Sequence, residues 1–333
     1  MVKASVIGCG GMGTIHAERY ASMPDVELVG VCDVNERSAS VLGKLTGAGF
    51  YTDVQQMFDS EKPDVVSITV PTFLHLPIVK LAADNGVHVI CEKPLALSAV
   101  EAEEAIQYCE QRGVRLFVGH VVRFFPSYRQ LTESATRFGG VRGGVYHAKR
   151  AGAHPGQVQP WFKDPNKSGG VILDLMIHDI DYILGAFGEV SEVYAFNHLS
   201  EELDYASATF RFRNGTIAQL EAFWGYPGPF HTSFEYAGAD GIVRGDSSDA
   251  ESLRVLRSQS GNSADGFVET PQSVLLKDPY YEEIAHFLEC FASGKEPIVS
   301  ALDALEAIRW AEAALESART GLPVNHARRE TRP

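Results

Sequence analysis

Short apolar runs alternate with amphipathic stretches over roughly the first third of the chain. Val- and Ile-rich runs between helical patterns are typical of βαβ units. Ser98 and Glu101 have the spacing of a capping box at the start of one helix. The pattern predicts strands over 3–8, 26–32, 64–70, 87–91 and 115–119 and helices over 12–22, 35–46, 73–85 and 98–112.

From about residue 141 the pattern changes to longer β-type segments. They cover 144–150, 190–197, 205–212, 216–224, 232–237 and 242–245, and helices are expected over 173–184, 281–292 and 301–320. Consecutive strands favour a mixed or antiparallel sheet. We therefore expect an α/β protein of two domains, a doubly wound parallel sheet in residues 1–121 and an α/β domain with a large open sheet in residues 122–333. The polar stretch 247–273 is expected to hold a hairpin or exposed loops.

Composition narrows the class of protein. The chain has 333 residues, of which 45% are hydrophobic and 22% charged, and its formal charge is -14. Such an acidic balance argues against nucleic-acid or anionic-membrane partners. The five cysteines form no C-x-x-C pair and read as buried, reduced side chains. The sequence shows no charged-then-apolar leader pattern and no apolar run long enough to span a bilayer, so the protein is expected to be cytoplasmic.

A glycine-rich turn follows the first predicted strand. Gly8, Gly10 and Gly13 form a G-x-G-x-x-G between strand and helix, with Gly11 and Met12 inside it. In this context the glycines permit a tight turn, close approach of a pyrophosphate and close packing of helix on strand. Asp33 ends the second strand, where a carboxylate accepts hydrogen bonds from ribose hydroxyls and repels a 2′-phosphate. The sequence therefore predicts NAD in preference to NADP, with Arg37 close by.

Two further candidates follow predicted strands of the same sheet. Glu92, Lys93 and Pro94 come directly after 87–91, at the sheet edge where ligands bind in doubly wound folds. An ammonium group there can stabilise a developing oxyanion, although a lysine after a strand is more often a surface charge. Pro94 also permits a cis peptide bond.

The second of these candidates is the turn after 64–70. Pro71, Thr72 and His75 are placed to contact the ribose or nicotinamide side of the cofactor. The alternative is an ordinary helix N-cap at Thr72.

Asp174 and His178 lie four residues apart in the predicted helix 173–184, and so share one face. An imidazole is suited to accept a hydroxyl proton near neutral pH, and a carboxylate one turn away can orient it. A helix-start acid with a hydrogen-bonded histidine is the alternative. Asp179 and Asp181 could join His178 at a metal, but no second ligand set supports this, and no metal is predicted.

Taken together, these motifs resemble the glucose–fructose oxidoreductase / inositol dehydrogenase / rhizopine-catabolism (Gfo/Idh/MocA) family over nearly the whole chain. The residues that carry the resemblance are Gly8–Gly13, Asp33, Pro71-Thr72-x-x-His75, Glu92-Lys93-Pro94 and Gly169-Gly170-x-x-x-Asp174-x-x-x-His178. Thr72 stands where one common family form has Asn.

The resemblance implies an N-terminal Rossmann domain and a C-terminal domain whose sheet mediates dimer or tetramer assembly. It also implies His178 as proton acceptor, Lys93 as the group that polarises the reacting oxygen, Asp174 as their support, and Glu92 near the nicotinamide.

Substrate contacts are harder to assign from sequence. Arg123 follows the last strand of the first domain, near the cleft in family terms. His154 and Trp161 precede the Asp174 helix in an irregular segment and are suited to binding a sugar ring, or else pack within their loop. Tyr236 is a weaker candidate from the second sheet.

The sequence thus favours an NAD-dependent dehydrogenase of a cyclic polyol or sugar, similar to myo-inositol 2-dehydrogenase. Three alternatives stay open: a dehydrogenase or reductase acting on another pyranose, an NAD-binding sensor without turnover, and a lyase or glycosidase that oxidises its substrate transiently.

Overall fold

The computed structural model describes residues 1–137, 143–239, 241–248, 254–258, 267–271 and 278–325. They form two compact units: unit 1 comprises residues 1–121 and 278–305, and unit 2 comprises the described residues from 122 to 271 and from 306 to 325. One break between the two units follows Val121.

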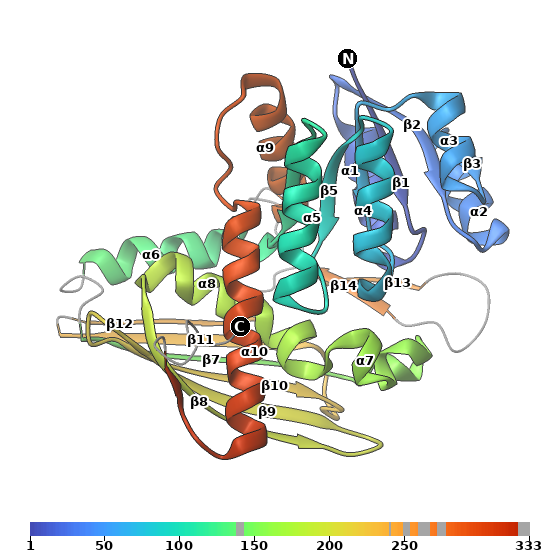
Figure 1. The fold of residues 1–333 in the computed structure, drawn as a ribbon. Coiled ribbons are helices and arrows are strands. Elements are labelled where there is room, and N and C mark those ends of the chain that lie inside the picture. The colour runs from blue at the N-terminus through green and yellow to red at the C-terminus, as the bar shows by residue number, and fades with distance from the viewer. Residues whose placement is uncertain (138–142, 240, 249–253, 259–266, 272–277, 326–333) are drawn as a thin grey trace. The chain divides into compact units, whose positions relative to one another are not determined.

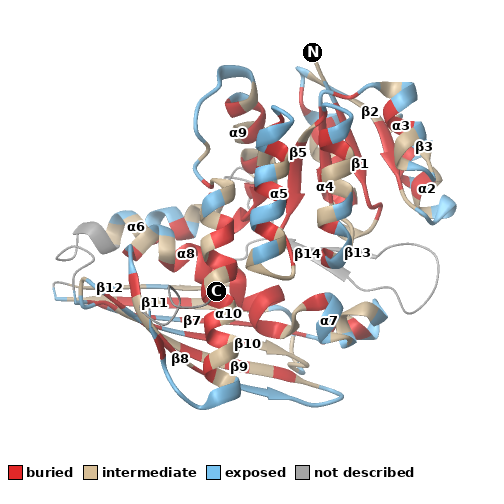
Figure 2. Ribbon diagram, in the orientation of Figure 1, coloured by how far each residue is buried: buried red, intermediate tan, exposed pale blue. Residues whose placement is uncertain are grey.

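Unit 1 is built on a six-stranded parallel sheet with the order β3-β2-β1-β4-β5-β6. This is the doubly wound order of a Rossmann fold, as predicted. Its strands are β1 (Val2–Ile7), β2 (Val26–Cys32), β3 (Gly49–Tyr51), β4 (Val65–Ile68), β5 (His88–Glu92) and β6 (Leu116–Gly119). Its helices are α1 (Gly11–Ser22), α2 (Glu36–Thr46), α3 (Val54–Glu61), α4 (His75–Asp84) and α5 (Ala99–Gln111). The interior of the sheet is buried, as the red strands in Figure 2 show.

Local sequence explains several element ends in unit 1. Asn35 and Asp53 accept hydrogen bonds from backbone N–H groups at the starts of α2 and α3, and Gly47 ends α2 in the left-handed conformation. Ser98 Oγ accepts the Glu101 N–H at 3.2 Å, which confirms the predicted cap on α5.

A late segment of the chain also belongs to unit 1. Helix α9 (Pro279–Ser293) packs against α1, and the ring of Phe287 stacks on Phe117 at 5.1 Å between centroids. Arg19 Nη2 lies 2.5 Å from Asp278 Oδ2. The sequence-based boundary assigned residues 278–305 to the second domain; these contacts group them with the first, because the apolar face of α9 is buried there.

Unit 2 carries a seven-stranded mixed sheet, as predicted, in the order β12-β11-β7-β10-β9-β8-β15 (Figure 1). Only the pair β7 and β10 is parallel. The strands are β7 (Val145–Gly152), β8 (Val190–Leu199), β9 (Asp204–Phe212), β10 (Ile217–Trp224), β11 (His231–Gly238), β12 (Gly241–Asp246) and β15 (Val324–Asn325). A separate hairpin of β13 (Arg254–Ser258) and β14 (Phe267–Pro271) lies within the stretch expected to contain one.

The helices of unit 2 are α6 (Pro126–Arg137), α7 (Pro165–Ser168), α8 (Ile177–Phe187) and most of α10 (Ala301–Thr320). Burial alternates along β9, so one face of the sheet is covered. On that face Phe210 meets Trp310 of α10 edge to face, and Ser317 of α10 accepts the Ala195 N–H at 3.0 Å. None of the described helices combines the length and apolar character that crossing a bilayer requires. All five cysteines are buried and free.

Candidate active site

The glycine-rich turn of unit 1 has the stereochemistry that a dinucleotide needs. Gly8 has a φ of +97°, which L side chains rarely adopt. A Cβ on Gly13 would lie 1.7 Å from Gly8 O, so only glycine lets α1 pack this close to β1. A Cβ on Gly10 would meet nothing within 4 Å. The backbone at Gly10 therefore faces open space at the N-terminus of α1, where free N–H groups favour an anion.

Asp33 is fixed beside this turn. Its Oδ2 accepts the Cys9 N–H at 2.7 Å and its Oδ1 accepts the Asn35 N–H at 2.8 Å. Each carboxylate oxygen retains acceptor capacity for a ribose hydroxyl. Arg37 lies exposed in the first turn of α2. The geometry of the turn and Asp33 fits an NAD molecule.

The segment after β4 differs from the expectation of a helix N-cap at Thr72. Thr72 is buried and begins a 3₁₀ turn, Thr72–Leu74, and no side-chain hydrogen bond caps α4, which starts at His75. The His75 ring lies 2.9 Å from the carbonyl oxygens of both Val70 and Pro94. A neutral imidazole donates to only one of them, and burial lowers the pKa of His75. The His75 ring therefore lies between Val70, just after β4, and Pro94, the residue that follows Lys93.

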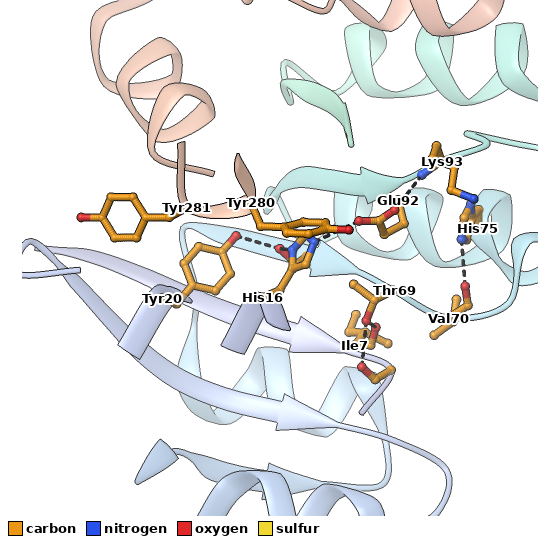
Figure 3. Close-up of polar contacts among 12 residues, drawn as sticks. Ile7, His16, Tyr20, Thr69, Val70, His75, Glu92, Lys93, Tyr280 and Tyr281 are labelled. Atoms are coloured by element: carbon orange, nitrogen blue, oxygen red, sulfur yellow. Dashed lines mark hydrogen bonds and ion pairs between the residues drawn. The ribbon is translucent and has the colours of Figure 1, made fainter. Parts of the chain in front are cut away.

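The Glu92–Pro94 segment ends β5 at the carboxyl edge of the sheet, and the Lys93–Pro94 bond is cis. The Glu92 carboxylate accepts the backbone N–H of Lys93 at 3.2 Å and faces His16 of α1 (Figure 3). Burial by itself raises the pKa of Glu92, but the hydrogen bond from His16 and the positive charge of Lys93 outweigh this, so the pKa lies below its usual value. Glu92 is therefore a buried carboxylate, and the partly buried Lys93 follows it directly.

In unit 2 a π-helical turn, Ile172–Met176, leads into α8, so the helix predicted over 173–184 is confirmed from residue 177 onward and is π-helical before it. Single π-turns inside helices are frequent at functional sites. Asp174 lies in this turn and is 7% exposed; its Oδ2 accepts the indole N–H of Trp224 at 3.0 Å. His178 follows in the first turn of α8 and is partly exposed. The π-turn thus carries a buried, oriented carboxylate, and the imidazole follows it in sequence.

Two arginines hold the next acids of α8. Arg150 of β7 donates to both oxygens of Asp179 at 3.0 and 2.9 Å, and this pair is buried. Arg123 binds Asp181 in the same bidentate way at 2.8 and 2.6 Å. The carboxylates of Asp179 and Asp181, which a metal site with His178 would need as ligands, are thus each bound by a guanidinium group. Arg123 therefore anchors α8, and substrate binding by Arg123 stays a prediction.

The other substrate candidates of unit 2 have different surroundings. His154 is buried; its Nδ1 accepts the Gly156 N–H at 3.0 Å, which leaves Nε2 as the protonated nitrogen of the neutral ring. Trp161 stacks on Phe162 at 3.8 Å between centroids and donates its N–H to Gln159. Tyr236 is fully buried and stacks on Phe187, so the weak substrate assignment of Tyr236 is wrong: its ring is core.

Comparison with known proteins identifies the family. Residues 2–120 match an oxidoreductase family described as an NAD-binding Rossmann fold, and residues 137–325 match the C-terminal α/β domain of the same family. The chain belongs to the Gfo/Idh/MocA oxidoreductases. It is 29% identical to scyllo-inositol 2-dehydrogenase (NAD(+)) of Bacillus subtilis, over 97% of this chain and 96% of that protein.

The chain is also similar to a sugar dehydrogenase and to a solved structure that contains NAD. The chain is 34% identical to D-glucoside 3-dehydrogenase of Escherichia coli, over 66% of this chain and 69% of that protein. The crystal structure of GenD2 from gentamicin A biosynthesis, in complex with NAD, superposes with a TM-score of 0.86 at 24% identity, covering 97% and 96% of the two chains. The two family matches make this chain an NAD-binding oxidoreductase of the Gfo/Idh/MocA family.

Sequence reasoning missed several residues that shape the candidate site of this Gfo/Idh/MocA protein. Trp224 orients Asp174 from the end of β10, and Asp204 accepts the Val171 N–H at 2.8 Å beside the π-turn. Arg150 and His16 were missed as well. Their partners lie 29 and 76 residues away in sequence, and no local pattern connects them.

Proposed function

We propose that this dehydrogenase oxidises a ring hydroxyl of a cyclic polyol or sugar to the ketone, in the manner of myo-inositol 2-dehydrogenase. The observation that carries the proposal is the π-turn, where Asp174 is buried and oriented, followed by His178 in the first turn of the next helix. A carboxylate and an imidazole so placed are suited to removing a hydroxyl proton.

His178 accepts the hydroxyl proton, Lys93 donates a hydrogen bond to the developing oxyanion, and Asp174 orients its catalytic partners. Bound NAD supplies the acceptor for the hydride that leaves the same carbon. The proton and the hydride together account for the two hydrogens lost when an alcohol becomes a ketone.

Twelve residues are proposed to hold NAD. They are Gly8, Gly10, Gly11, Met12, Gly13, Asp33, Arg37, Pro71, Thr72, His75, Glu92 and Lys93. The open backbone at Gly10 and the Asp33 carboxylate support the assignment most directly. Because both nitrogens of His75 face carbonyl groups, we assign its contact with the cofactor to the backbone or to the ring face.

Lys93, Asp174 and His178 are also proposed to contact the substrate, and Arg123, His154 and Trp161 are proposed as further substrate contacts. The buried His154 is the best supported of the last three, because its Nε2–H is the available donor of the neutral ring. Trp161 offers an aromatic face to the apolar side of a sugar ring.

A panel of inositols, hexoses and glucosides tests the proposal, with NADH formation as the signal and NADP in parallel. Lys93→Met and His178→Ala are the catalytic controls. Oxidation at C2 of an inositol would favour a function like that of scyllo-inositol 2-dehydrogenase. Oxidation at C3 of a glucoside would favour a function like that of D-glucoside 3-dehydrogenase. Undiminished turnover in both variants would reject these roles.

We also propose assembly through the open face of the unit 2 sheet. A hollow of about 710 Å³ lies on that face, and its lining includes Lys149, Ser207, Gln219 and Glu221. Light scattering of wild type and Glu221→Arg tests this: a dimer or tetramer that dissociates in the variant supports it, and a monomeric wild type contradicts it.

A further inference from the structure

A buried chain of polar side chains connects α1 to the residue before Lys93. Tyr20 Oη lies 2.8 Å from Ser67 Oγ, Ser67 Oγ lies 2.9 Å from His16 Nδ1, and His16 Nε2 lies 3.0 Å from Glu92 Oε1. Tyr20, His16 and Ser67 are fully buried. Figure 3 shows His16 between the carboxylate of Glu92 and the end of Tyr20. The chain brings together α1, β4 and β5, three separate elements of unit 1.

The donors and acceptors of this chain can be assigned in one direction. Burial raises the pKa of Tyr20, so its hydroxyl stays protonated and can donate to Ser67. Ser67 then donates to His16 Nδ1, and His16 Nε2–H donates to Glu92. The other Glu92 oxygen accepts the backbone N–H of Lys93. Each of these links has a donor and an acceptor, which is what polar groups buried this deeply require.

The connection joins two parts of the proposed site. Helix α1 begins at the glycine-rich turn, and Glu92 precedes Lys93 directly in the chain. The space around Glu92 is tight, since a Cβ on Gly119 would lie 3.2 Å from Glu92 Oε1. Glu92 is therefore restrained by β6 as well as by His16.

We propose that His16 is a positioning residue for Lys93: it fixes the Glu92 carboxylate to α1 and so sets where the next residue presents its ammonium group. This inference rests on the proposed function of Lys93. It gives α1 a second task beside holding the pyrophosphate, because the same helix then aligns the group that polarises the substrate oxygen.

Replacing His16 by Phe tests the proposal, because the ring is kept and both hydrogen-bonding nitrogens are lost. We expect kcat for the best polyol to fall about 10- to 100-fold, the scale of a roughly 1 Å misplacement of a catalytic group. The dissociation constant for NAD is expected to change less than about threefold. A tenfold change would require the loss of about 1.4 kcal/mol of interaction with the cofactor. His16→Gln restores an N–H donor toward Glu92 and should recover most of kcat.

His88→Phe is the matched control. His88 starts β5, the strand that Glu92 ends, and its Nδ1 accepts the Arg115 N–H at 2.9 Å. The same substitution at this end of the strand should leave kcat within about twofold of wild type. If His16→Phe does not fold, Ser67→Ala replaces it, since this change removes the partner of His16 Nδ1 and leaves the ring in place.

The outcomes separate the two proposals. Loss of turnover in Lys93→Met, combined with wild-type kcat in folded His16→Phe and Ser67→Ala, overturns the role of His16 alone. Full turnover in Lys93→Met overturns the proposed role of Lys93 in the reaction, on which this inference rests. A lower melting temperature with unchanged kcat, or no rescue by Gln, would show that His16 serves packing only and would also overturn the inference.

Discussion

Replacing either of two glycines of the same turn by alanine should affect a different property of the protein. At Gly13 the added methyl group would lie 1.7 Å from Gly8 O, 2.8 Å from Gly8 C and 2.9 Å from Thr69 Oγ1. Two of these three atoms are backbone, so α1 must move away from β1. At Gly10 the methyl group would meet nothing within 4 Å. Gly13→Ala therefore tests packing, and Gly10→Ala tests the approach of a ligand.

The expected magnitudes differ accordingly. Overpacking of this kind costs about 1–3 kcal/mol. For domains of roughly 150–250 residues, each kcal/mol lowers the melting temperature by about 2–4 °C. Gly10 is the N-cap of α1, where alanine is less favourable than glycine by at most about 1 kcal/mol. In the complex, however, its methyl group would stand between the backbone and the pyrophosphate, and we expect affinity for NAD to fall at least about tenfold, or about 1.4 kcal/mol.

Calorimetry measures both quantities, the unfolding transition by scanning and the dissociation constant for NAD by titration. The reasoning requires Gly13→Ala to unfold at the lower temperature and Gly10→Ala, still folded, to bind NAD more weakly. Wild-type affinity in Gly10→Ala would refute the assignment of the pyrophosphate to this turn. Equal melting temperatures in the two variants would refute the packing argument.

Three more predictions follow from buried contacts. Arg150→Met leaves Asp179 charged and unpaired, so we expect a loss of about 3–5 kcal/mol in urea unfolding; a loss below about 1 kcal/mol would contradict this, and adding Asp179→Leu should recover most of it. Trp224→Phe removes the N–H that orients Asp174 and keeps the aromatic ring, so kcat should fall about tenfold at an unchanged melting temperature; wild-type kcat would argue against the orienting bond. Burial places the pKa of His75 below its usual 6.5, so near that pH the native state binds fewer protons than the unfolded state. The neutral buried ring therefore stabilises the native state above pH 6.5, and this stabilisation is lost as the pH falls below 6.5. A His75→Gln variant should accordingly show a smaller drop in melting temperature on acidification.

Much of the first unit was predictable because its signals are local. The G-x-G-x-x-G turn, the Asp33 carboxylate and the Ser98 cap each depend on a few neighbouring residues, and short-range stereochemistry decides them. The strands β3 and β15 were missed, since two or three residues carry too little pattern to predict a strand.

The surroundings of the candidate catalytic residues were less predictable. The spacing of Asp174 and His178 was visible, but a regular helix was expected where a π-turn occurs. Sequence periodicity also could not show that Tyr236 lies in the core, because the partner that covers it, Phe187, comes from another element.

The sequence alone determined the fold class, the family and the cofactor, because these depend on contiguous motifs, and it supplied the residues proposed for the site. Only the tertiary structure placed α9 with unit 1, paired Arg150 with Asp179 and linked His16 to Glu92. These contacts join residues far apart in the chain. Their partners are chosen by how the sheets and helices pack, and packing is a property of the whole fold rather than of any short stretch of residues.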